Sequence, residues 1–558
     1  MACAVLRPLV TELAHTVPMG TEGYTTVPYA MAWTFWWQAD RIAHGFAGFW
    51  EAPIFHPTEH TFALSETNTL GAFLMAPVTL LSGSHALGHN LFLLLALALN
   101  GFSASRLLMA VGARRMVALV GGAAVLMLPQ PHQEIGVLPL VPVFGIVWSL
   151  HALLRWTRQP SWGSGALVGL ALAVTYLLCF QYALFLVIVV GALGWLFLRP
   201  DLLRPRPLAT LLLGAVLAGG IVAPVVSAQL GAVTEEAGFT RKKSKVEALA
   251  CEPRHYARTP WRQAIRPPGI GVAKEAGWKA FYPGTARIVL AVLGLTWALG
   301  RRRAWRWAWF LGGGALLAYA FSLGPHLAVG GANLWEIMAE WVPGYSKVRS
   351  VNRWSVFFEL FVVLLGAFGL QALVDRVTGR PPEGADGGFL PARGWRRGGW
   401  TLASLVMGGL LAAEIVPPPQ RLQPVPSLEE HAGWGTFIQE NTPEDAVLAF
   451  LPFSSGGHVK VYQDDAAWMM LGPAYRRDMI NGYSSYFPKP FRQLKKDLEG
   501  FPTPEGVEAL REVGVTWLVL DQEEYPSHLL GGYPGGEALT LRFQDDRAGV
   551  DVYELSDP

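Results

Sequence analysis

Acidic and imidazole side chains are concentrated in residues 1–84, ahead of a long apolar run. The candidates among them are Glu22, Asp40, Glu51, His56, Glu59, His60 and Glu66. A carboxylate beside a membrane could act as the general base on an acceptor hydroxyl, and carboxylate oxygens could also bind a divalent cation such as Mg2+ or Mn2+. For any single residue a solvated loop is the ordinary explanation, so the signal lies in the group. His56 and Glu66 are among those that could line a site.

Three cations lie together in residues 341–354, ahead of another apolar run. They are Lys347, Arg349 and Arg353. Arg349 and Arg353 are four residues apart, so on a helix they would share one face. A pair of guanidinium groups suits a phosphate or pyrophosphate. Anchoring to ordinary lipid headgroups would use the same cations, and that alternative stays open.

The short turn at residues 128–134 contains His132 and Glu134, which we predict at the start of a helix. There they could line a site, or they could cap the helix that follows. Further polar residues fall inside apolar runs, where they usually face the interior of a helical bundle. Asn90 and Asn100 are of this kind, and such residues more often join helices than bind a ligand. The others are His89, Gln181 and Glu414.

Several classes of site are excluded by composition and motif. The net charge of +2 gives no general signal for a nucleic-acid partner, and none is expected. Cys3, Cys179 and Cys251 are widely spaced and odd in number, so they predict neither a disulfide framework nor a zinc site. Phosphate-loop, nucleophile-elbow, zinc-helix and dinucleotide signatures are absent from any credible context.

The elements that must position these residues are predicted to be membrane-spanning helices, because the composition is that of a membrane protein. Hydrophobic residues make up 52% of the chain and charged residues 15%, whereas soluble domains average about 25% charged residues. Because a spanning helix needs about 20 mostly apolar residues, we predict about ten spans. They lie near residues 86–106, 115–130, 137–155, 164–180, 181–198, 208–230, 285–300, 303–324, 354–374 and 400–417. The fourth and fifth form one continuous apolar run, which we expect to turn near residues 179–181.

Arginines follow every second run, which predicts that these short loops face the cytoplasm. Examples are Arg106, Arg155, Arg204, Arg302 and Arg376. The segment 1–84 then lies outside with no helix before it to export it. We therefore expect a missing first span, and about eleven helices in a complete chain. The apolar stretch 70–81 contains Pro77 and is too short to span, so an interfacial helix is predicted there.

After residues 417–419, which are all proline, the sequence becomes mixed and charged. Short buried strands are predicted at 446–451 and 516–520, a helix at 504–512 and a last strand at 550–554. The domain prediction is a first outer segment at 1–84, a transmembrane helical domain at 85–418 and an extracytoplasmic soluble α/β domain at 419–558.

Several short segments resemble one group of multi-pass proteins along nearly the whole chain. They include Gly20-Thr21-Glu22, Trp33-Thr34-Phe35-Trp36-Trp37, Pro53-Ile54-Phe55-His56-Pro57, Gly88-His89-Asn90-Leu91, Val348-Arg349-Ser350-Val351-Asn352-Arg353 and Asn481-Gly482-Tyr483-Ser484. The chain resembles bacterial membrane proteins related to GT-C glycosyltransferases. The resemblance is specific for membership of this group and less so for activity.

The resemblance implies an enzyme of the bacterial inner membrane that takes a sugar from a polyprenyl-phosphate carrier. Transfer would occur on the outer face, to a cell-envelope glycan or protein acceptor. Glu22 resembles the catalytic carboxylate of the first outer loop, where family members commonly have aspartate, and Asp40 is the next candidate. Arg349 and Arg353, with Lys347 beside them, resemble contacts to the lipid phosphate. The rival hypothesis is a non-catalytic membrane protein that binds or transports lipid-linked glycans.

Overall fold

The computed structural model describes residues 2–235, 243–260, 267–272, 279–300, 304–377, 414, 416–526 and 535–556. The chain forms two compact units. The first unit consists of Met1–Val10, Leu93–Ala223 and Thr240–Gln420, and the second consists of Thr11–Phe92, Pro224–Phe239 and Arg421–Pro558. The predicted first outer segment and C-terminal region therefore fall largely in the same unit, while the domain boundaries of the sequence analysis stay a prediction.

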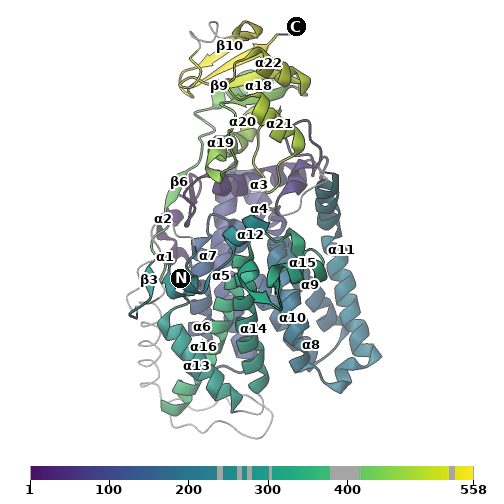
Figure 1. Cartoon of the computed structure of the whole chain (residues 1–558), viewed down its shortest axis with the longest axis vertical. Helices are drawn as coiled ribbons and strands as arrows, with labels where there is room; N and C mark the ends of the chain where they lie inside the picture. Colours follow the sequence, from purple (N-terminus) through teal and green to yellow (C-terminus); the bar gives the residue numbers. More distant parts are fainter. Residues whose placement is uncertain are drawn as a thin grey trace. The chain divides into compact units, whose positions relative to one another are not determined.

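The first unit contains two short two-stranded sheets, β2 (Arg258–Thr259) with β3 (Gly271–Val272) and β4 (Ala328–Val329) with β5 (Ala332–Asn333). The rest of this unit is built from helices (Figure 1). They are α1 (Ala2–Val5), α2 (Arg7–Val10), α6 (Arg115–Leu126), α7 (Pro129–Gln133), α8 (Phe144–Arg158), α9 (Trp162–Leu178), α10 (Phe180–Leu193), α12 (Lys243–Leu249), α13 (Thr285–Leu299), α14 (Trp305–Leu323), α15 (Leu334–Trp341) and α16 (Ser355–Val377). Helices α5 (His85–Ala110) and α11 (Pro205–Glu235) contribute to both units because each crosses a unit boundary.

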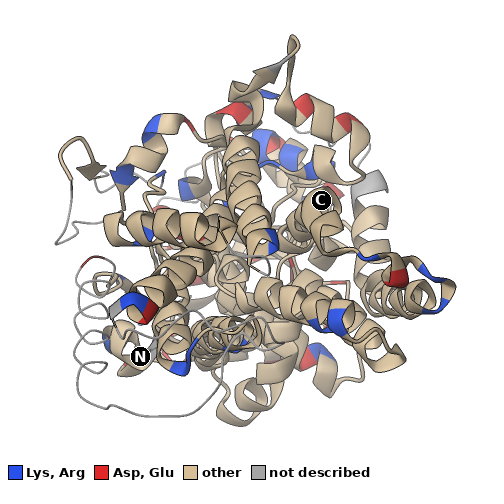
Figure 2. Ribbon diagram, turned by 90° about the horizontal axis from the view of Figure 1, so that it is seen from below, with Lys and Arg blue, Asp and Glu red and all other residues tan. Residues whose placement is uncertain are grey.

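Among the described residues, six helical segments are long and apolar enough to cross a membrane. They are His85–Ala110, Leu138–Arg158, Phe180–Phe197, Pro205–Ala232, Trp305–His326 and Val351–Arg376. Figure 2 shows long stretches of helix without any Lys, Arg, Asp or Glu. All six segments coincide with predicted runs, and α9 and α13 are shorter apolar helices on two more. The polytopic helical fold is confirmed, whereas run 400–417 lies largely outside the described residues and the count of about ten spans stays a prediction.

Small residues set the closest helix contacts of the first unit. A Cβ atom on Gly369 of α16 would lie 1.9 Å from the Leu290 carbonyl oxygen of α13, and one on Gly294 would lie 2.0 Å from the Leu365 carbonyl oxygen. Glycine lets two backbones approach to a distance at which their peptide groups touch, which is how many membrane helices associate. The predicted turn near residues 179–181 is also confirmed, since α9 ends at Leu178, Cys179 is extended and α10 begins at Phe180.

The second unit begins with strand β1 (Thr16–Pro18), helix α3 (Thr26–Ala43) and helix α4 (Thr69–Ser82). Strand β1 pairs with β6 (Leu422–Pro424), so the start of this unit is joined to its C-terminal region. The predicted short helix around Pro77 is confirmed as α4. Its interfacial position stays a prediction. Asn90 fixes the start of the unit by donating from Nδ2 to the carbonyl oxygens of Leu13 (2.8 Å) and Thr16 (2.6 Å).

Within the described C-terminal region, five strands form a sheet of order β10-β11-β9-β7-β8. The strands are β7 (Val447–Leu451), β8 (Asp478–Met479), β9 (Val515–Asp521), β10 (Leu539–Asp545) and β11 (Val550–Leu555). The helices are α18 (Ala432–Asn441), α19 (Gln463–Met470), α20 (Gly472–Tyr475), α21 (Lys489–Asp497) and α22 (Pro504–Glu512). Strand β7 runs parallel to β8 and β9 and is buried on both faces, as its unbroken apolar run predicts. The small α/β domain is confirmed.

One hydrophobic core joins the first outer segment to this sheet. It includes Trp33 and Trp37 of α3, Phe55 of the following loop, and Phe450 of β7. Backbone hydrogen bonds continue the contact, because the amide of Phe55 donates to the carbonyl oxygen of Asn481 and that of His56 donates to Met479, both at 3.0 Å. The segment around residues 53–56 thus covers the β8 edge of the sheet, which would otherwise expose unpaired backbone groups.

Candidate functional site

Glu22 lies in the turn between β1 and α3, where its side chain is half-buried. Its amide donates to the carbonyl oxygen of Met19 at 3.0 Å, and the amide of Met19 donates to that of Arg421 at 2.9 Å. Because Arg421 immediately precedes β6, the turn is held by the same pairing that joins the start of the unit to its C-terminal region. The backbone that carries Glu22 is therefore fixed on the side that precedes α3.

The loop after β7 and the first residue of α19 fix the turn on its other side. The Thr25 amide donates to Gln463 Oε1 at 3.3 Å, and the Thr26 hydroxyl donates to the Val459 carbonyl oxygen at 2.8 Å. The rings of Tyr24 and His458 meet edge to face, with centroids 5.5 Å apart. The turn of Glu22 and the loop at residues 452–462 are thus in direct contact inside the second unit.

A buried polar network supports that loop. Asp465 of α19 is 1% exposed, and it contacts the Ser454 hydroxyl and accepts from Asn481 Nδ2 at 2.8 Å. Asn481 also bonds both the amide and the carbonyl oxygen of Phe450, at 2.8 and 2.9 Å. Burial raises the pKa of Asp465 to about 6, and the hydrogen bonds from Ser454 and Asn481 oppose that rise.

Asp40 lies near the other end of α3, roughly 21 Å along the helix from Thr26 at about 1.5 Å per residue. Its side chain is buried, and Arg41 donates to Oδ2 through Nε at 3.0 Å and through Nη2. Arg476 Nη1 lies 3.4 Å from Oδ1, and His44 Nδ1 lies 3.5 Å from Oδ2. Glu22 and Asp40 therefore do not share a site, and both oxygens of Asp40 already face cations.

His56 and Glu66 lie in the same unit as Glu22. His56 Nδ1 lies 3.9 Å from Asp478 Oδ2 at the covered edge of the sheet. Burial raises the pKa of Asp478, and the neighbouring His56 opposes the rise. Glu66 is half-buried in the loop before α4. A role for either residue in lining a site stays a prediction.

The three predicted phosphate-binding cations belong to the first unit, and all three are half-buried. Lys347 ends the short 3-10 helix η7 (Tyr345–Lys347), and Arg353 lies in η8 (Val351–Trp354). Arg349 precedes η8, so the expectation that Arg349 and Arg353 share one helical face is wrong. The reason is local, because residues 348–350, which are not helical, separate the two short helices. Arg353 Nη1 donates to Gln181 Oε1 at 2.9 Å.

The predicted helix start at His132 and Glu134 is also wrong. His132 lies in the last turn of the five-residue helix α7 and Glu134 follows it. Helix α8 begins only at Phe144, after Val143, and no side chain caps it. His132 is buried and its Nε2 lies 2.9 Å from the Leu126 carbonyl oxygen. The turn between α7 and α8 is longer than the sequence suggested, and a site-lining role for both residues stays a prediction.

Buried charges that the sequence analysis did not single out lie in the helices of the first unit. Arg287 of α13 donates from Nη2 to the carbonyl oxygens of Ala124 (2.8 Å) and Met127 (3.0 Å). Glu359 of α16 accepts from the Gln130 amide at 3.0 Å. A charge inside an apolar run is the signal that could have found both residues. Glu414 was singled out, and it accepts from the Ala286 amide at 2.8 Å at the start of α13.

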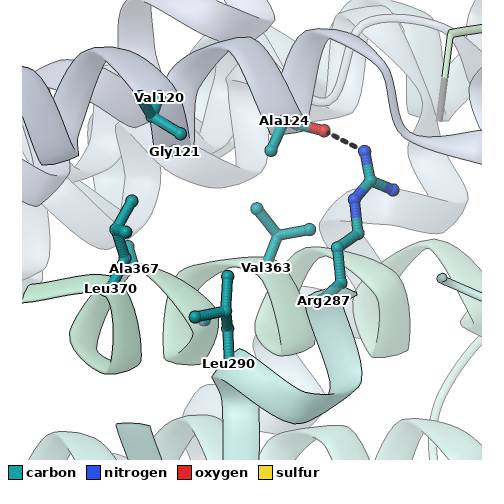
Figure 3. A pocket seen from close by; sticks show the side chains of 9 residues that line it. Val120, Gly121, Ala124, Arg287, Leu290, Val363, Ala367 and Leu370 are labelled. Carbon is teal, nitrogen blue, oxygen red and sulfur yellow. Dashed lines mark hydrogen bonds between the residues drawn. The ribbon is translucent and has the colours of Figure 1, made fainter. Parts of the chain in front are cut away.

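Arg287 borders a small apolar hollow between α6, α13 and α16 (Figure 3). Its guanidinium group points to the Ala124 carbonyl oxygen, and the remaining lining includes Leu290, Val363 and Leu370. The hollow has a volume of about 20 Å3, which is room for roughly one water molecule. It is too small and too apolar to hold a sugar.

Within the described part of the chain, no three His, Cys, Asp or Glu side chains lie close enough together to hold a metal ion. Asp40 is also a poor fit as a ligand, because a divalent cation would have to displace Arg41 and Arg476 from its oxygens.

Comparisons with known proteins agree with the fold. No curated protein matches the chain. The family model described as "Domain of unknown function (DUF6311)" matches residues 18–379. The cryo-EM structure of arabinofuranosyltransferase AftD from Mycobacteria matches with a TM-score of 0.56 at 13% identity, over 100% of this chain and 39% of AftD. A mutant of AftD gives a TM-score of 0.55 at 15% identity, over 100% and 41%.

The oligosaccharyltransferase AglB from Archaeoglobus fulgidus, in complex with an inhibitory peptide and a dolichol-phosphate, has a TM-score of 0.49 at 11% identity, over 96% of this chain and 70% of AglB. At these identities the AftD matches establish the fold, and the chain spans only about two fifths of the AftD length. The protein is thus a GT-C-like multi-pass membrane protein, and it belongs to the DUF6311 family.

Proposed function

We propose that the protein is a membrane glycosyltransferase that transfers a sugar from a polyprenyl-phosphate carrier to a cell-envelope acceptor. The observation that carries the proposal is the fold match to an arabinofuranosyltransferase over the whole chain. We place the reaction on the outer face of the bacterial inner membrane, with the α/β domain on the same side. The alternation of arginine-rich loops supports that orientation.

Glu22 is the proposed general base. Its carboxylate takes the proton of an acceptor hydroxyl while that oxygen forms a bond to the anomeric carbon of the sugar. The bond between this carbon and the carrier phosphate breaks, and the phosphate leaves with the electron pair. The position of Glu22 supports this role, because its turn is held on both sides and its side chain is only half-buried. A fixed backbone keeps the carboxylate oriented without excluding a substrate.

Lys347, Arg349 and Arg353 are the proposed contacts to the phosphate of the carrier. Negative charge grows on the leaving phosphate, and cations held beside it stabilise the transition state more than the ground state. Guanidinium groups also bind phosphate through two parallel hydrogen bonds. The bond from Arg353 to Gln181 supports this role, because it orients one guanidinium group in advance.

Asp40 has a different role in this proposal. Arg41 and Arg476 already pair with its two carboxylate oxygens, so a substrate hydroxyl would have to displace a cation to reach either of them. It ties α3 to the C-terminal region, since Arg476 follows α20 of that region. We therefore assign Asp40 to positioning and Glu22 to chemistry.

The test is sugar transfer by the purified full chain from a panel of polyprenyl-phosphate sugars. Glu22→Gln keeps the size of the side chain and removes the base, so turnover should fall about 100-fold to 10,000-fold. Glu59→Gln is the matched control, because Glu59 is an exposed carboxylate of the same segment, and it should leave turnover unchanged. Arg349→Ala should weaken carrier binding.

Loss of transfer in Glu22→Gln with intact carrier binding would establish the enzyme and its base. Carrier binding without transfer, unchanged by Glu22→Gln, would instead support a protein that binds or transports lipid-linked glycans.

A further inference from the structure

Three arginines and a histidine lie together where α5 and α8 end. Arg106 lies one turn before the end of α5, and Arg155 and Arg158 belong to the last turn of α8. The charges of all three arginines act on the half-buried imidazole of His151, so the four side chains form one basic cluster. Arg158 Nη1 also donates to the carbonyl oxygen of Ala110, the last residue of α5, at 2.9 Å. The cluster therefore spans the ends of two neighbouring helices.

Carboxylates do not neutralise the basic cluster. Between Glu66 and Asp201 the chain contains a single acidic residue, Glu134. Glu134 precedes α8, whereas the cluster lies where that helix ends. Asp201 already pairs with Arg199 at 3.1 Å. Among the residues that the structure describes, no Asp or Glu forms an ion pair with an arginine of the cluster.

The helix dipoles neutralise only part of the charge. The C-terminus of a helix is equivalent to a charge of about −0.5, so the ends of α5 and α8 together supply about −1. The three arginines supply three positive charges, and all three side chains are exposed. About two positive charges therefore remain on this surface. Basic clusters of this kind between membrane helices attract the headgroups of anionic lipids.

Apolar side chains beside the cluster continue the surface toward the lipid. Phe102 lies one helical turn before Arg106 on α5, so the two side chains share a face, and Phe102 is 59% exposed. Trp162 begins α9, four residues after Arg158, and is 53% exposed. Tryptophan is enriched at the level of the lipid headgroups. Because α5 is long and apolar enough to cross a membrane, an exposed phenylalanine next to an exposed arginine suits one acyl chain and its headgroup.

We propose that the ends of α5 and α8 bind an anionic phospholipid, and that Arg106, Arg155 and Arg158 hold its phosphate groups. The remaining charge of about two suits a headgroup with two phosphates, as in diphosphatidylglycerol. Guanidinium groups bind phosphate through paired hydrogen bonds. A zwitterionic lipid brings no net charge to the cluster. The site uses none of the residues assigned to sugar transfer, so it stands apart from the proposed function.

The test is binding of diphosphatidylglycerol to the detergent-solubilised full chain by native mass spectrometry, with phosphatidylcholine as the neutral lipid. Arg155→Gln should lower the affinity about fivefold, and Arg106→Gln combined with Arg155→Gln at least about tenfold. Both variants keep the bond between Arg158 and Ala110, so the helix ends should stay together. Arg199→Gln is the matched control, because Arg199 is already paired with Asp201, and it should bind the lipid as the parent does.

A second variant separates lost binding from lost folding. Arg106→Lys combined with Arg155→Lys keeps both charges and should keep most of the affinity, whereas the melting temperature without lipid should be the same in the Gln and Lys variants. Equal affinity for diphosphatidylglycerol and phosphatidylcholine would overturn the proposal. Unchanged affinity in the double Gln variant would overturn it as well, and so would an equal loss in Arg199→Gln and Arg155→Gln.

Discussion

The buried carboxyl of Asp465 gives the sharpest prediction about pH. The Ser454 hydroxyl carries one proton, and both the Val461 carbonyl oxygen and Asp465 Oδ2 accept from it, so this bond only partly compensates a buried carboxylate. Asp465→Asn imitates the protonated, uncharged carboxyl, and its side-chain oxygen can still accept from Asn481.

The magnitude follows from the pKa. Burial raises the pKa of Asp465 from 3.8 to about 6, so the folded state binds the proton more tightly than the unfolded state. Stability therefore falls as pH rises from about 4 to about 6, by about 3 kcal/mol in total. The start of α19 favours an ionised carboxylate by only about 0.3–1 kcal/mol, so burial dominates.

The assay is thermal unfolding of the detergent-solubilised full chain from pH 4 to pH 8. Asp465→Asn should match the parent near pH 4 and should unfold several degrees higher at pH 8, with a smaller pH dependence. The control is Asp464→Asn, which removes a charge from an exposed neighbour on the same helix. If Asp465→Asn unfolds lower than the parent at pH 8, the carboxyl is ionised in the fold and the reasoning fails.

Two further predictions concern packing and ion pairs. Gly369→Ala should destabilise the helical unit by at least about 2 kcal/mol, because its Cβ would lie 1.9 Å from the Leu290 carbonyl oxygen. The control is Gly366→Ala on the same helix, which should unfold as the parent does because the nearest atom to its Cβ would lie at 3.5 Å. Equal melting temperatures of both variants would refute the close contact of α13 and α16. Asp40→Asn should lower the melting temperature and reduce the free energy of unfolding by about 1–3 kcal/mol, because Arg41 loses its counterion. Sugar transfer per folded molecule should persist. Loss of sugar transfer without loss of stability would make Asp40 the base.

Local patterns of apolar residues in the sequence predict most of the fold. Apolar runs longer than a water-facing helix could bury predict membrane helices, and β7 was predicted because a strand covered on both faces must be apolar throughout. The wrong predictions concern short segments, in which few residues determine the backbone conformation. The spacing of Arg349 and Arg353 implies a shared face only if one helix includes both, and residues 348–350 are not helical. The sequence predicts a helix start at His132 because its local pattern does not distinguish a five-residue helix from a longer one.

The candidate site was harder to predict because side-chain chemistry depends on contacts between distant segments. Glu22, Asp40 and Asp465 are all carboxylates, yet each has a different environment. Arg41 and Arg476 neutralise Asp40, so it joins segments more than 400 residues apart in the chain. Burial keeps Asp465 protonated to about pH 6, so it supports a loop. Glu22 lies in a turn next to Thr25, which bonds to the start of α19, and Thr26, which bonds to this same loop. The C-terminal domain thus helps to determine the orientation of the proposed base. The sequence of the first 84 residues alone does not predict this, because it does not contain the C-terminal residues that Thr25 and Thr26 contact.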